Sequence, residues 1–598
     1  MGLDCRARKG HITDTDYRDL NLIAVDTETT GLEWHNGHYP FLATTSTASD
    51  DSVYDLTGGP GPEEFVEEMV YADGWIFHNA AFDIHMIAQA GLMDLEELLA
   101  RPIHDTATLA RILISVEEAN WQYGLKPLSK LLVDSSYGDA QDELKDAMVA
   151  LGIAKKNQKI LPDGAFYDTW QQMPALVEKY AMQDTRATYD LFFTLLARAS
   201  EADLKVYEME MDVLKELIRM EHRGVALDTD RVKQLFDEYT EYMNAALAKL
   251  MVFVTIEDFN PDSNDQVAQT LIQAGVPLTD LTDSGQIRVD KWALGRHEGH
   301  PCIDALLEYR MYAKFLSTYL GSMLGKEVLH PSIWGIGART GRMSCSNPNM
   351  QNIPVRSGPE VRSVMVPREG YAFIVADYSS IELRVLAYYM ADPAFWDIVL
   401  DPDHDAFAWL GEQIYGTHDQ SLWPVSRSAL KNGTYAILYG AGGPKLASTI
   451  GGGMTAEEGR ELARSIRTAL GRHFTVLNNS VKKAVKTYGF VRTIMKRTQH
   501  VPRDRDYTGL NYLIQGSAAD VMKLGLLNAA KACRDYGAYL LLPVHDELVI
   551  ECPLEHVNEC RDAVETAMTT AIDPLELTNP MPLAVSSAIC NNSYAEAK

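Results

Sequence analysis

The chain has 598 residues, enough for three or four domains of ordinary size, which rules out a small binding module. Hydrophobic residues make up 46% and charged residues 23%, which excludes a disordered, collagen-like or coiled-coil chain. Seven scattered cysteines without CxxC spacing argue against structural zinc and a secreted disulfide framework. The sequence shows neither an apolar signal segment nor a membrane-spanning run, so we expect a cytoplasmic protein.

The net charge of −29 argues, at first sight, against binding to nucleic acid, because an acidic surface repels a polyphosphate. The charge is unevenly distributed. Residues 1–200 carry 15 basic and 32 acidic side chains, whereas residues 425–525 carry 16 basic and 6 acidic ones. The second segment is a candidate phosphate-binding surface, although a solvated helix face is the ordinary explanation of such a charge run.

In the first third of the chain, NLIAVDTETTGL predicts a buried strand over residues 22–25 that ends in polar residues. VYADGWIFHNAAFDIHMI predicts a second strand that leads into a helix, the pattern of an α/β domain. A long helix follows from MPALVEKYAMQD, and helical sequence continues without a break to about Arg223. We place the first domain at residues 1–200. Gly224 predicts a helix end and Asp228 the cap of the next helix, in a mostly helical region to residue 330.

The C-terminal half begins with different patterning. RSVMVPREGYAFIVADYSSIELRVLAYYM predicts a strand at residues 372–376 and a helix from about Ser380. AYLLLPVHDELVIECP contains two apolar runs on either side of a polar turn, which predicts an antiparallel hairpin with acidic residues at its tip. The sequence between these two segments is helical.

Acidic residues of the first domain stand at predicted strand and helix ends: Asp26 and Glu28, then Asp83 after HNAAF, and Asp184 after YAMQ. Each alone is more often a cap or surface carboxylate. Together they are the hard oxygen ligands with which two divalent ions promote phosphodiester hydrolysis. Tyr180 lies one helical turn before Asp184.

The ordered motifs DxE, NxxxD and YxxxD resemble the DEDD exonuclease family, in its tyrosine-bearing subgroup. The resemblance implies an RNase H-like fold and a site for two metal ions held by Asp26, Glu28, Asp83 and Asp184. It further implies that Tyr180 orients the attacking water and that Asn79 lies near the bound strand end. Packing on a helix for Tyr180 and a turn or cap role for Asn79 are the structural alternatives.

A second set of acids lies in the C-terminal half, where Asp377 closes a predicted strand and Asp546 sits at the hairpin turn. Buried acids from distant segments repel each other unless metal ions compensate their charge. Between them, RSALKNGTYAILYG places two cations and two aromatic rings at successive steps of four on one helix, at Arg427, Lys431, Tyr435 and Tyr439. This order suits a nucleoside triphosphate, because the two cations can bind its phosphates and an aromatic ring can contact its base and sugar.

These segments resemble the family A DNA polymerases, the family of bacterial DNA polymerase I and of several phage replicases. GARTGRMSCSNPNMQNIP is similar to the family's template-primer segment, VADYSSIELR to motif A, RSALKNGTYAILYG to motif B and PVHDELVIE to motif C. The resemblance implies a right-hand polymerase after the exonuclease domain, in an α/β and α+β multidomain chain. It divides residues 201–598 into a thumb at about 205–330, a palm at about 331–400 and 525–598, and fingers at about 401–524.

The resemblance also assigns roles. Asp377 and Asp546 would bind two catalytic metal ions, Mg²⁺ with Mn²⁺ as a substitute, and Glu547 would support them. Nucleotide-binding residues would be Arg427, Lys431, Tyr435, Tyr439, His404 and Glu382, with Lys431 the proton donor to pyrophosphate and Glu382 the steric gate against ribonucleotides. Contacts with primer-template DNA would come from Arg342, Asn511 and Gln515. Helix-surface polarity is the alternative for the last two.

The main hypothesis is therefore a DNA-directed DNA polymerase that extends a primer with dNTPs and proofreads with a 3′–5′ exonuclease. Only 25 residues precede the DxE motif, and position 435 is Tyr where many bacterial relatives have Phe; both features favour a phage replicative enzyme over a bacterial repair enzyme. We also expect a monomer in the host cytoplasm, with unidentified replisome partners and no membrane contact. One alternative is a metal-dependent exonuclease whose polymerase half only binds DNA. Another is a catalytically silent nucleic-acid scaffold.

Overall fold

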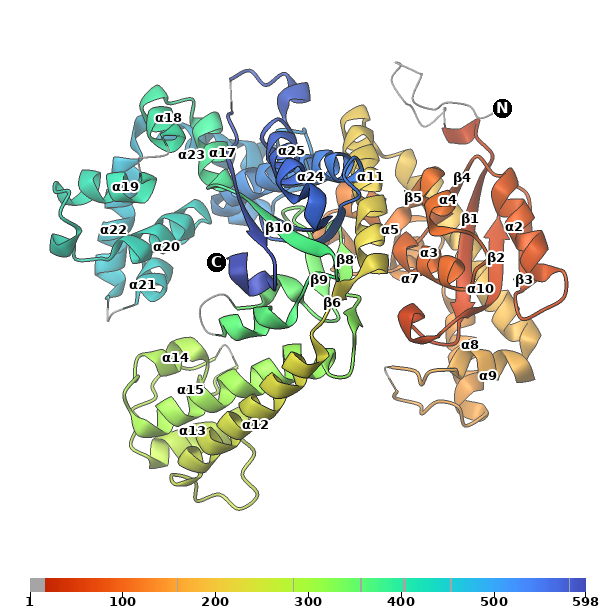
Figure 1. Ribbon diagram of the computed structural model, residues 1–598, viewed down its shortest axis with the longest axis horizontal. Coiled ribbons are helices and arrows are strands. Elements are labelled where there is room, and N and C mark those ends of the chain that lie inside the picture. Colours follow the sequence, from red (N-terminus) through yellow and green to blue (C-terminus); the bar gives the residue numbers. More distant parts are fainter. Residues whose placement is uncertain are drawn as a thin grey trace.

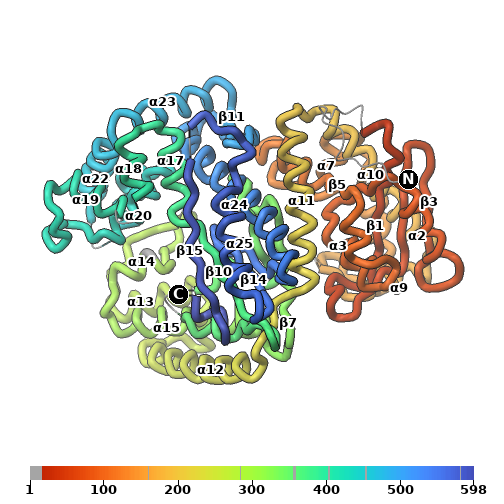
Figure 2. Tube along the Cα trace, turned by 45° about the horizontal axis from the view of Figure 1, so that its top comes forward, coloured from red at the N-terminus to blue at the C-terminus, as the bar shows by residue number. Residues whose placement is uncertain are grey.

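The computed structural model describes residues 17–597, apart from 159, 283, 355–357, 402–404, 452–453 and 580. Figure 1 shows a five-stranded sheet with its helices at one end of the molecule, at the right, and a second sheet in the middle. A helical arm of residues 229–323 lies below that second sheet, and a helical lobe of residues 393–488 lies at the far left. Figure 2 shows that α11 (Glu201–Arg223) stands between the two sheets.

The N-terminal sheet has the strand order β3-β2-β1-β4-β5, with β1 antiparallel to β2 and parallel to β4. Its strands are β1 (Leu22–Thr29), β2 (Pro40–Ser46), β3 (Asp51–Asp55), β4 (Gly74–Phe77) and β5 (Ile103–Asp105). The predicted strand at residues 22–25 is therefore real but too short. Asp26 and Glu28 lie within β1 rather than after it, and their spacing of two places both side chains on one face of the sheet.

Helices cover this sheet, and the predicted strand-to-helix unit is confirmed by β4 and α3. The helices are α2 (Gly61–Tyr71), α3 (Ala80–Gln89), α4 (Leu95–Ala100), α5 (Thr106–Leu113), α6 (Val116–Ala119), α7 (Leu125–Leu132), α8 (Asp139–Ala150), α9 (Ala165–Gln172) and α10 (Pro174–Leu196). Helix α10 packs along β1 and β2 and also contacts α7. It carries both predicted residues of the YxxxD motif to the sheet.

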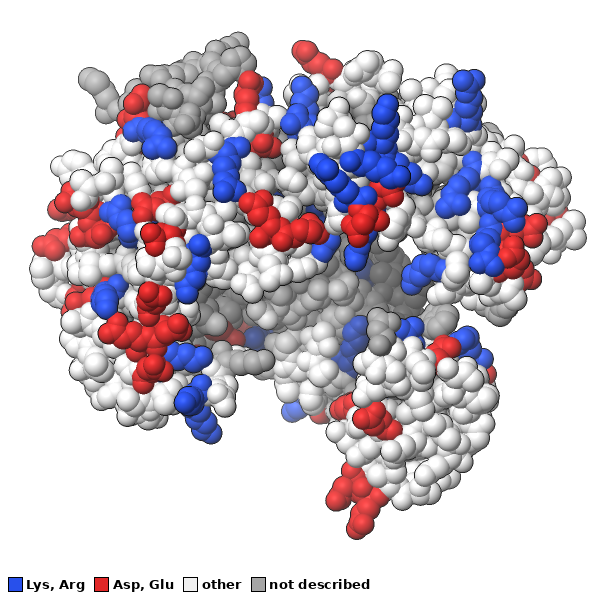
Figure 3. Space-filling model, turned by 180° about the vertical axis from the view of Figure 1, so that it is seen from behind, with Lys and Arg blue, Asp and Glu red and all other residues white. Residues whose placement is uncertain are grey.

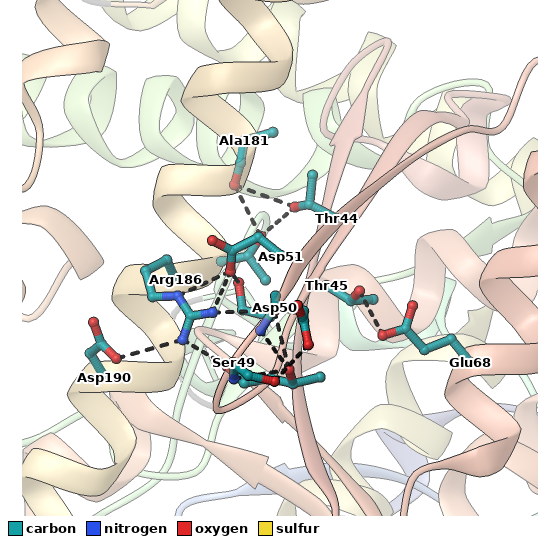
Figure 4. A network of polar contacts seen from close by, with 12 residues as sticks. Thr44, Thr45, Ser49, Asp50, Asp51, Glu68, Ala181, Arg186 and Asp190 are labelled. Carbon is teal, nitrogen blue, oxygen red and sulfur yellow. Dashed lines mark hydrogen bonds and ion pairs between the residues drawn. The ribbon is translucent and has the colours of Figure 1, made fainter.

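A polar clamp fixes α10 against the β2–β3 hairpin (Figure 4). The guanidinium of Arg186 donates to the carbonyl oxygens of Thr47, at 2.7 Å, and Asp50, at 3.2 Å, and its Nε donates to Asp51 at 3.0 Å. More than one turn earlier on α10, the Ala181 carbonyl accepts the Thr44 hydroxyl at 3.3 Å. These contacts set the position of α10 relative to the strand that bears Asp26.

The helical sequence between α10 and Arg223 is interrupted, so the prediction of an unbroken helix is wrong. Ser200 begins α11 with a capping box, in which its hydroxyl accepts from the Asp203 amide and the Asp203 carboxylate accepts from Ser200. The helix ends at Gly224, as predicted, where φ is +63° and a side chain would collide with the Leu329 carbonyl. Helix α11 packs on α5 and β5 on one side and on α24 (Gly509–Arg534) and β13 (Tyr539–Val544) on the other.

The arm starts at Asp228, which caps its first helix by accepting from the Arg231 amide at 2.9 Å, as the sequence predicts. A small apolar core of its own, separate from that of the middle sheet, fills its tip. Its elements are α12 (Thr229–Met251), α13 (Asn264–Gln273), α14 (Lys291–Gly295), α15 (Pro301–Lys314), η2 (Phe315–Leu320) and α16 (Gly321–Met323). The arm joins the rest of the molecule through a short ribbon of β6 (Val225–Ala226) and β7 (Val328–Leu329). A second short hairpin of β8 (Ser332–Trp334) and β9 (Ser344–Ser346) follows it, and β8 packs on α11.

The middle sheet is antiparallel, with the order β13-β14-β10-β15. Strand β10 (Tyr371–Tyr378) is longer than predicted and includes Asp377, which pairs directly with Glu547 at the start of β14 (Glu547–Pro553). The predicted hairpin is formed by β13 and β14. The other elements are β15 (Val585–Cys590), α17 (Ile381–Met390) after the predicted junction at Ser380, α24 and α25 (Val557–Thr569).

The left lobe and a small returning hairpin complete the molecule. Their elements are α18 (Pro393–Leu400), α19 (Ala406–Tyr415), α20 (Arg427–Leu438), α21 (Gly443–Ile450), α22 (Ala456–Ala469), α23 (Gly471–Tyr488), β11 (Phe490–Arg492) and β12 (Thr498–His500). Figure 3 shows from behind that Lys and Arg side chains gather over the half that contains this lobe, whereas acidic groups are prominent over the N-terminal unit. A hollow separates the arm from the body in the same view.

Candidate active sites

The structure brings together the acids of the N-terminal unit, although they are up to 158 residues apart in the sequence (26 to 184). Asp26 and Glu28 come from β1, Asp83 from α3 and Asp184 from α10. The charges of Asp83, Glu28 and Asp184 each raise the pKa of Asp26, so the four carboxylates lie within electrostatic range of one another. Glu28, Asp83 and Asp184 are at most 9% exposed.

Charge repulsion and burial dominate this site. Burial, followed by the charge of Asp83, raises the pKa of Asp26 well above its usual range. Burial also raises the pKa of Glu28 to about 8 and that of Asp184 above its ordinary value. Such a cluster is chemically suited to a cation, because a bound positive charge would stabilise the ionised form of every member.

Asp83 is held in place by β1. Its Oδ1 accepts the Thr27 amide at 3.0 Å and the Thr27 hydroxyl at 2.7 Å. These bonds favour the carboxylate form, yet burial prevails and raises the pKa of Asp83 to about 7. Thr27, the middle residue of the DxE motif, therefore orients Asp83. The motif alone does not reveal this role.

Lys126 is the residue of this site that the sequence reasoning missed. Its Nζ lies 2.7 Å from Asp184 Oδ2 and 2.6 Å from the Tyr180 hydroxyl, so α7 delivers an ammonium group into the acidic cluster. Tyr180 itself is 7% exposed and its pKa is raised by burial and by the charge of Asp184. The spacing of LKPL gives no sign of this contact, because α7 and α10 meet only in the tertiary structure.

Asn79 precedes α3 in a left-handed conformation, with φ of 72°. The carboxylate of Asp105 accepts the backbone amides of Asn79 and Ala80, both at 3.2 Å, and also caps α5. Asn79 lines a cavity of about 930 Å³ between the N-terminal unit and the loops around β8 and Asn347. The cavity has room for the end of a nucleic-acid strand beside Asn79, the residue predicted to lie near it.

A second site lies at the end of the middle sheet. The backbone amide of Tyr378, next to Asp377, donates to the Asp546 carbonyl at 3.1 Å, which joins the strand end to the hairpin turn. Burial raises the pKa of Asp546, and Arg342 opposes this effect from 3.9 Å. Glu547 is buried, and its carboxylate accepts from the Tyr594 hydroxyl.

The four resembling motifs meet at Glu382, on the first turn of α17. Its carboxylate forms an ion pair with Arg342 and accepts the Tyr439 hydroxyl at 2.6 Å. The Tyr439 hydroxyl is also bonded to Gln515 of α24. Arg342 in turn faces both Glu382 and Asp546, so the structure gathers predicted residues from all four segments around one point.

Helix α20 presents the predicted cations and rings from the left lobe, and Tyr439 follows directly after its last residue. The rings of Tyr435 and Tyr439 stack 6.0 Å apart, and Tyr435 also contacts Phe407 of α19. Burial and the charges of Glu382 and Asp546 raise the pKa of Tyr435, which places this ring beside the acids.

The remaining predicted residues differ in their surroundings. Arg427 pairs with Asp405, and Lys431 is exposed, with its Nζ 5.7 Å from the Phe407 ring. The amide oxygen of Asn511 is buried and has no hydrogen-bond partner among the described residues. His404 lies outside the described residues.

Within the part of the chain that the structure describes, no three His, Cys, Asp or Glu side chains stand in the geometry of a ready metal site. The carboxylate oxygens of the N-terminal cluster nevertheless fit divalent ions. A bound cation would offset the repulsion and burial that raise the pKa values of Asp26 and Glu28. No described helix is both long and apolar enough to cross a bilayer.

Comparison with known proteins decides the family. Residues 229–595 match the sequence model of DNA polymerase family A, and residues 14–198 match that of a 3′–5′ exonuclease family. The chain belongs to DNA polymerase family A. The polymerase match alone spans more than half of the 598 residues, and both families are generally dependent on divalent metal ions.

Among the relatives, thermostable DNA polymerase I of Thermus filiformis is 30% identical over 434 residues, which cover 68% of this chain and 50% of that protein. DNA polymerase I of Synechocystis is 28% identical over 571 residues, covering 88% of this chain and 53% of the relative. The chain thus spans about half the length of the curated relatives it matches.

A solved structure of the POL domain of Pol1 from M. smegmatis, in complex with DNA primer-template and dNTP, superposes with a TM-score of 0.78. The match covers 98% of this chain and 97% of that one at 22% sequence identity. The predicted fold class, an exonuclease domain followed by a polymerase domain of mixed α and β structure, is confirmed. The phage origin stays a prediction.

Proposed function

We propose that this family A protein is a DNA-directed DNA polymerase that extends a primer with dNTPs and removes nucleotides from the 3′ end at a second site. The observation that carries the proposal is the meeting of Arg342, Glu382, Tyr439 and Asp546 at the end of the middle sheet. These residues come from four separate segments, and Arg342 faces the carboxylates of both Glu382 and Asp546. Such an arrangement matches the placement that nucleotidyl transfer requires.

At the polymerase site, Asp377 and Asp546 would hold two Mg²⁺ ions, with Mn²⁺ as a substitute, and Glu547 would stiffen the strand beside them. The ions would activate the primer hydroxyl and stabilise charge on the transferred phosphate. Because Glu547 pairs with Asp377 across β10 and β14, any movement of Glu547 would displace the ligand opposite. The hold of Tyr594 on Glu547 restrains that movement.

The incoming dNTP would lie against α20. Arg427 and Lys431 would meet its phosphates, together with His404, and Lys431 would supply a proton to the leaving pyrophosphate. The ring of Tyr435 would contact the base and sugar. Arg427 must first release Asp405, because its Nε is paired with that carboxylate here.

Glu382 would act as the steric gate against the ribose 2′-hydroxyl, with Tyr439 holding it in place. Arg342, Asn511 and Gln515 would contact the primer-template, where the minor groove offers acceptors at every base pair. Asn511 and Gln515 lie one turn apart on α24, which supports a shared contact of their amide groups with the DNA.

The second site would use Asp26, Glu28, Asp83 and Asp184 to hold two divalent ions, with Tyr180 orienting the attacking water and Asn79 beside the strand end. We also propose the domain division given by the sequence: exonuclease at residues 1–200, thumb at 205–330, fingers at 401–524 and palm in the remaining two segments. The five-stranded sheet, the arm, the left lobe and the middle sheet support this division in turn.

The polymerase half is tested by Asp546→Ala in a primer-extension assay with Mg²⁺ and dNTPs. We expect extension to fall by at least a hundredfold, because one of two metal ligands is lost. Asp535→Ala, which removes an exposed acid just before β13, is the matched control and should extend normally. If the wild type only shortens primers, the alternative of an exonuclease with a DNA-binding polymerase-like half replaces the proposal.

A further inference from the structure

A lysine occupies the acidic cluster of the N-terminal unit. The Nζ atom of Lys126 lies 2.7 Å from Asp184 Oδ2 and 2.6 Å from the Tyr180 hydroxyl, and 4.3 Å from the centre of the Tyr180 ring. One ammonium group thus contacts both residues of the YxxxD motif at once. The Lys126 side chain is only 17% exposed, so these contacts are largely shielded from water.

The placement of Lys126 is fixed by the packing of its helix. Helix α7 contacts α10 and buries Leu128 in the core beneath it. Lys126 points toward α10, whereas Lys130, one turn later on the same helix, is exposed. The contrast shows that the acidic cluster receives one specific lysine from α7 rather than a general basic face.

The charge of Lys126 reaches beyond the two residues it touches. It lowers the pKa of Asp26, Glu28 and Asp184, against the burial and mutual repulsion that raise them. Lys126 is therefore the cation that the fold itself supplies to this cluster. A divalent ion binding there meets a positive charge already in contact with Asp184.

We propose that Lys126 is a positioning residue of the exonuclease site, which holds the Asp184 carboxylate and the Tyr180 hydroxyl in one arrangement and competes with divalent ions for Asp184. This inference rests on the proposed exonuclease function. It has two consequences of opposite direction. Loss of the ammonium group impairs hydrolysis, because Tyr180 loses the partner that orients it. The same loss tightens binding of divalent ions, because a repelling charge disappears.

The test compares Lys126→Met, which keeps the length of the side chain without its charge, with Lys130→Met as the matched control on the same helix. Three quantities are measured on the full chain: the rate of primer shortening without dNTPs, the rate of extension with dNTPs, and the Mn²⁺ affinity by electron paramagnetic resonance. A parallel Asp26→Ala titration identifies the part of the Mn²⁺ signal that belongs to this cluster.

For Lys126→Met we expect shortening at least tenfold slower, unchanged extension and Mn²⁺ binding at the cluster several-fold tighter. Lys130→Met should match the wild type in all three. Lys126→Arg, which keeps the charge and protects the fold, should leave Mn²⁺ affinity close to that of the wild type while shortening slows.

Wild-type shortening by Lys126→Met would overturn the inference. So would a joint loss of shortening and Mn²⁺ binding, which would make Lys126 only part of the scaffold. If the wild type extends primers but never shortens them, the proposed exonuclease function fails instead, and the Mn²⁺ affinities still decide whether Lys126 competes for Asp184.

Discussion

Glu382 is the side chain that links the segments of the proposed polymerase site. Arg342 neutralises it, the Tyr439 hydroxyl holds one of its oxygens at 2.6 Å, and it is 6% exposed. A hydrogen bond to a charged group contributes about 1.5–3 kcal/mol, so removing one of the two partners should loosen the carboxylate without displacing it. If Glu382 acts as the proposed gate, selectivity against the ribose 2′-hydroxyl should depend on the Tyr439 hydroxyl.

We therefore expect Tyr439→Phe to raise ribonucleotide incorporation relative to deoxynucleotide incorporation by about tenfold, the equivalent of about 1.4 kcal/mol. The measurement is the ratio of kcat/KM for a ribonucleoside and a deoxyribonucleoside triphosphate opposite the same template base. Tyr488→Phe, at an exposed position in the same lobe, is the control. An unchanged ratio in Tyr439→Phe would show that its hydroxyl does not hold the gate.

At the scale of elements, α10 is the helix whose position matters most, because it carries Tyr180 and Asp184. Arg186→Ala removes the clamp to the β2–β3 hairpin and should lower the free energy of unfolding of the N-terminal unit by about 1 kcal/mol, since the side chain is 23% exposed. Urea unfolding measures this change. Lys179→Ala, which removes an exposed ion pair from the same helix, should cost less than about 0.5 kcal/mol. Equal effects would contradict the role of the clamp.

The short helix η1 (Trp34–Asn36) forms a second element-scale junction. The rings of His85 and His222 both stack on Trp34, at 4.4 and 5.1 Å, and on each other at 5.7 Å, and His330 meets Trp34 edge-on. Burial lowers the pKa of His222 to about 4 and also lowers that of His330. The folded state therefore favours the neutral forms of His222 and His330, whereas these side chains bind protons below about pH 6.5 in the unfolded chain. Stability should fall as the pH drops from 6.5 toward 4.

His222→Phe tests this sign, because it keeps an aromatic ring and removes the ionisation. Between pH 7.5 and 5.5 the wild type should lose about 1 kcal/mol more than the variant, measured by urea unfolding at each pH. Identical pH dependence of the two proteins would show that this junction does not contribute to acid sensitivity.

At the scale of the whole molecule, a buried charge network fixes α11, the helix that packs on α5 and β5 of the N-terminal unit, to α24 and the β11–β12 hairpin of the polymerase half. Glu210 of α11 bonds to Arg497 beside β12 and to Lys523 of α24, and Arg497 also pairs with Asp520 at 2.8 Å. All four side chains are at most 3% exposed. Burial lowers the pKa of Lys523 to about 8, so the network depends on Glu210 to keep that ammonium charged.

Glu210→Gln leaves two buried cations with a single carboxylate, and we expect it to lower the free energy of unfolding by about 3 kcal/mol. It should also separate the unfolding of the two halves, which calorimetry would reveal as two transitions. Lys205→Gln, exposed on the same helix, should change neither. A single unshifted transition in Glu210→Gln would show that other contacts of α11 hold the halves together.

The sequence was informative where function depends on residues close together in the chain. The helix with Arg427, the hairpin with Asp546 and the YxxxD helix all form where patterning predicted them, because local periodicity and turn residues determine such elements. Strand ends were predicted too short at Asp26 and Asp377, since polar residues in a strand look like its end. The break at Ser200 was missed because helical sequence flanks it on both sides.

Contacts between distant segments could not be predicted in this way. Lys126 meets Tyr180 across 54 residues and Glu210 meets Arg497 across 287, and neither pair has a local pattern. Their partners are chosen by how helices pack on one another, which a single sequence does not specify. These long-range contacts, one at the N-terminal site and one at the junction of α11, are therefore what only the structure supplied.

The most direct test of two separate sites is one gel with a labelled primer on a DNA template in Mg²⁺, with and without dNTPs, comparing wild type, Asp377→Ala and Asp26→Ala. We predict that the wild type extends with dNTPs and shortens without them. Asp377→Ala should lose only extension, and Asp26→Ala only shortening. A wild type that shortens but never extends, or a single substitution that abolishes both activities in a folded protein, would contradict the account.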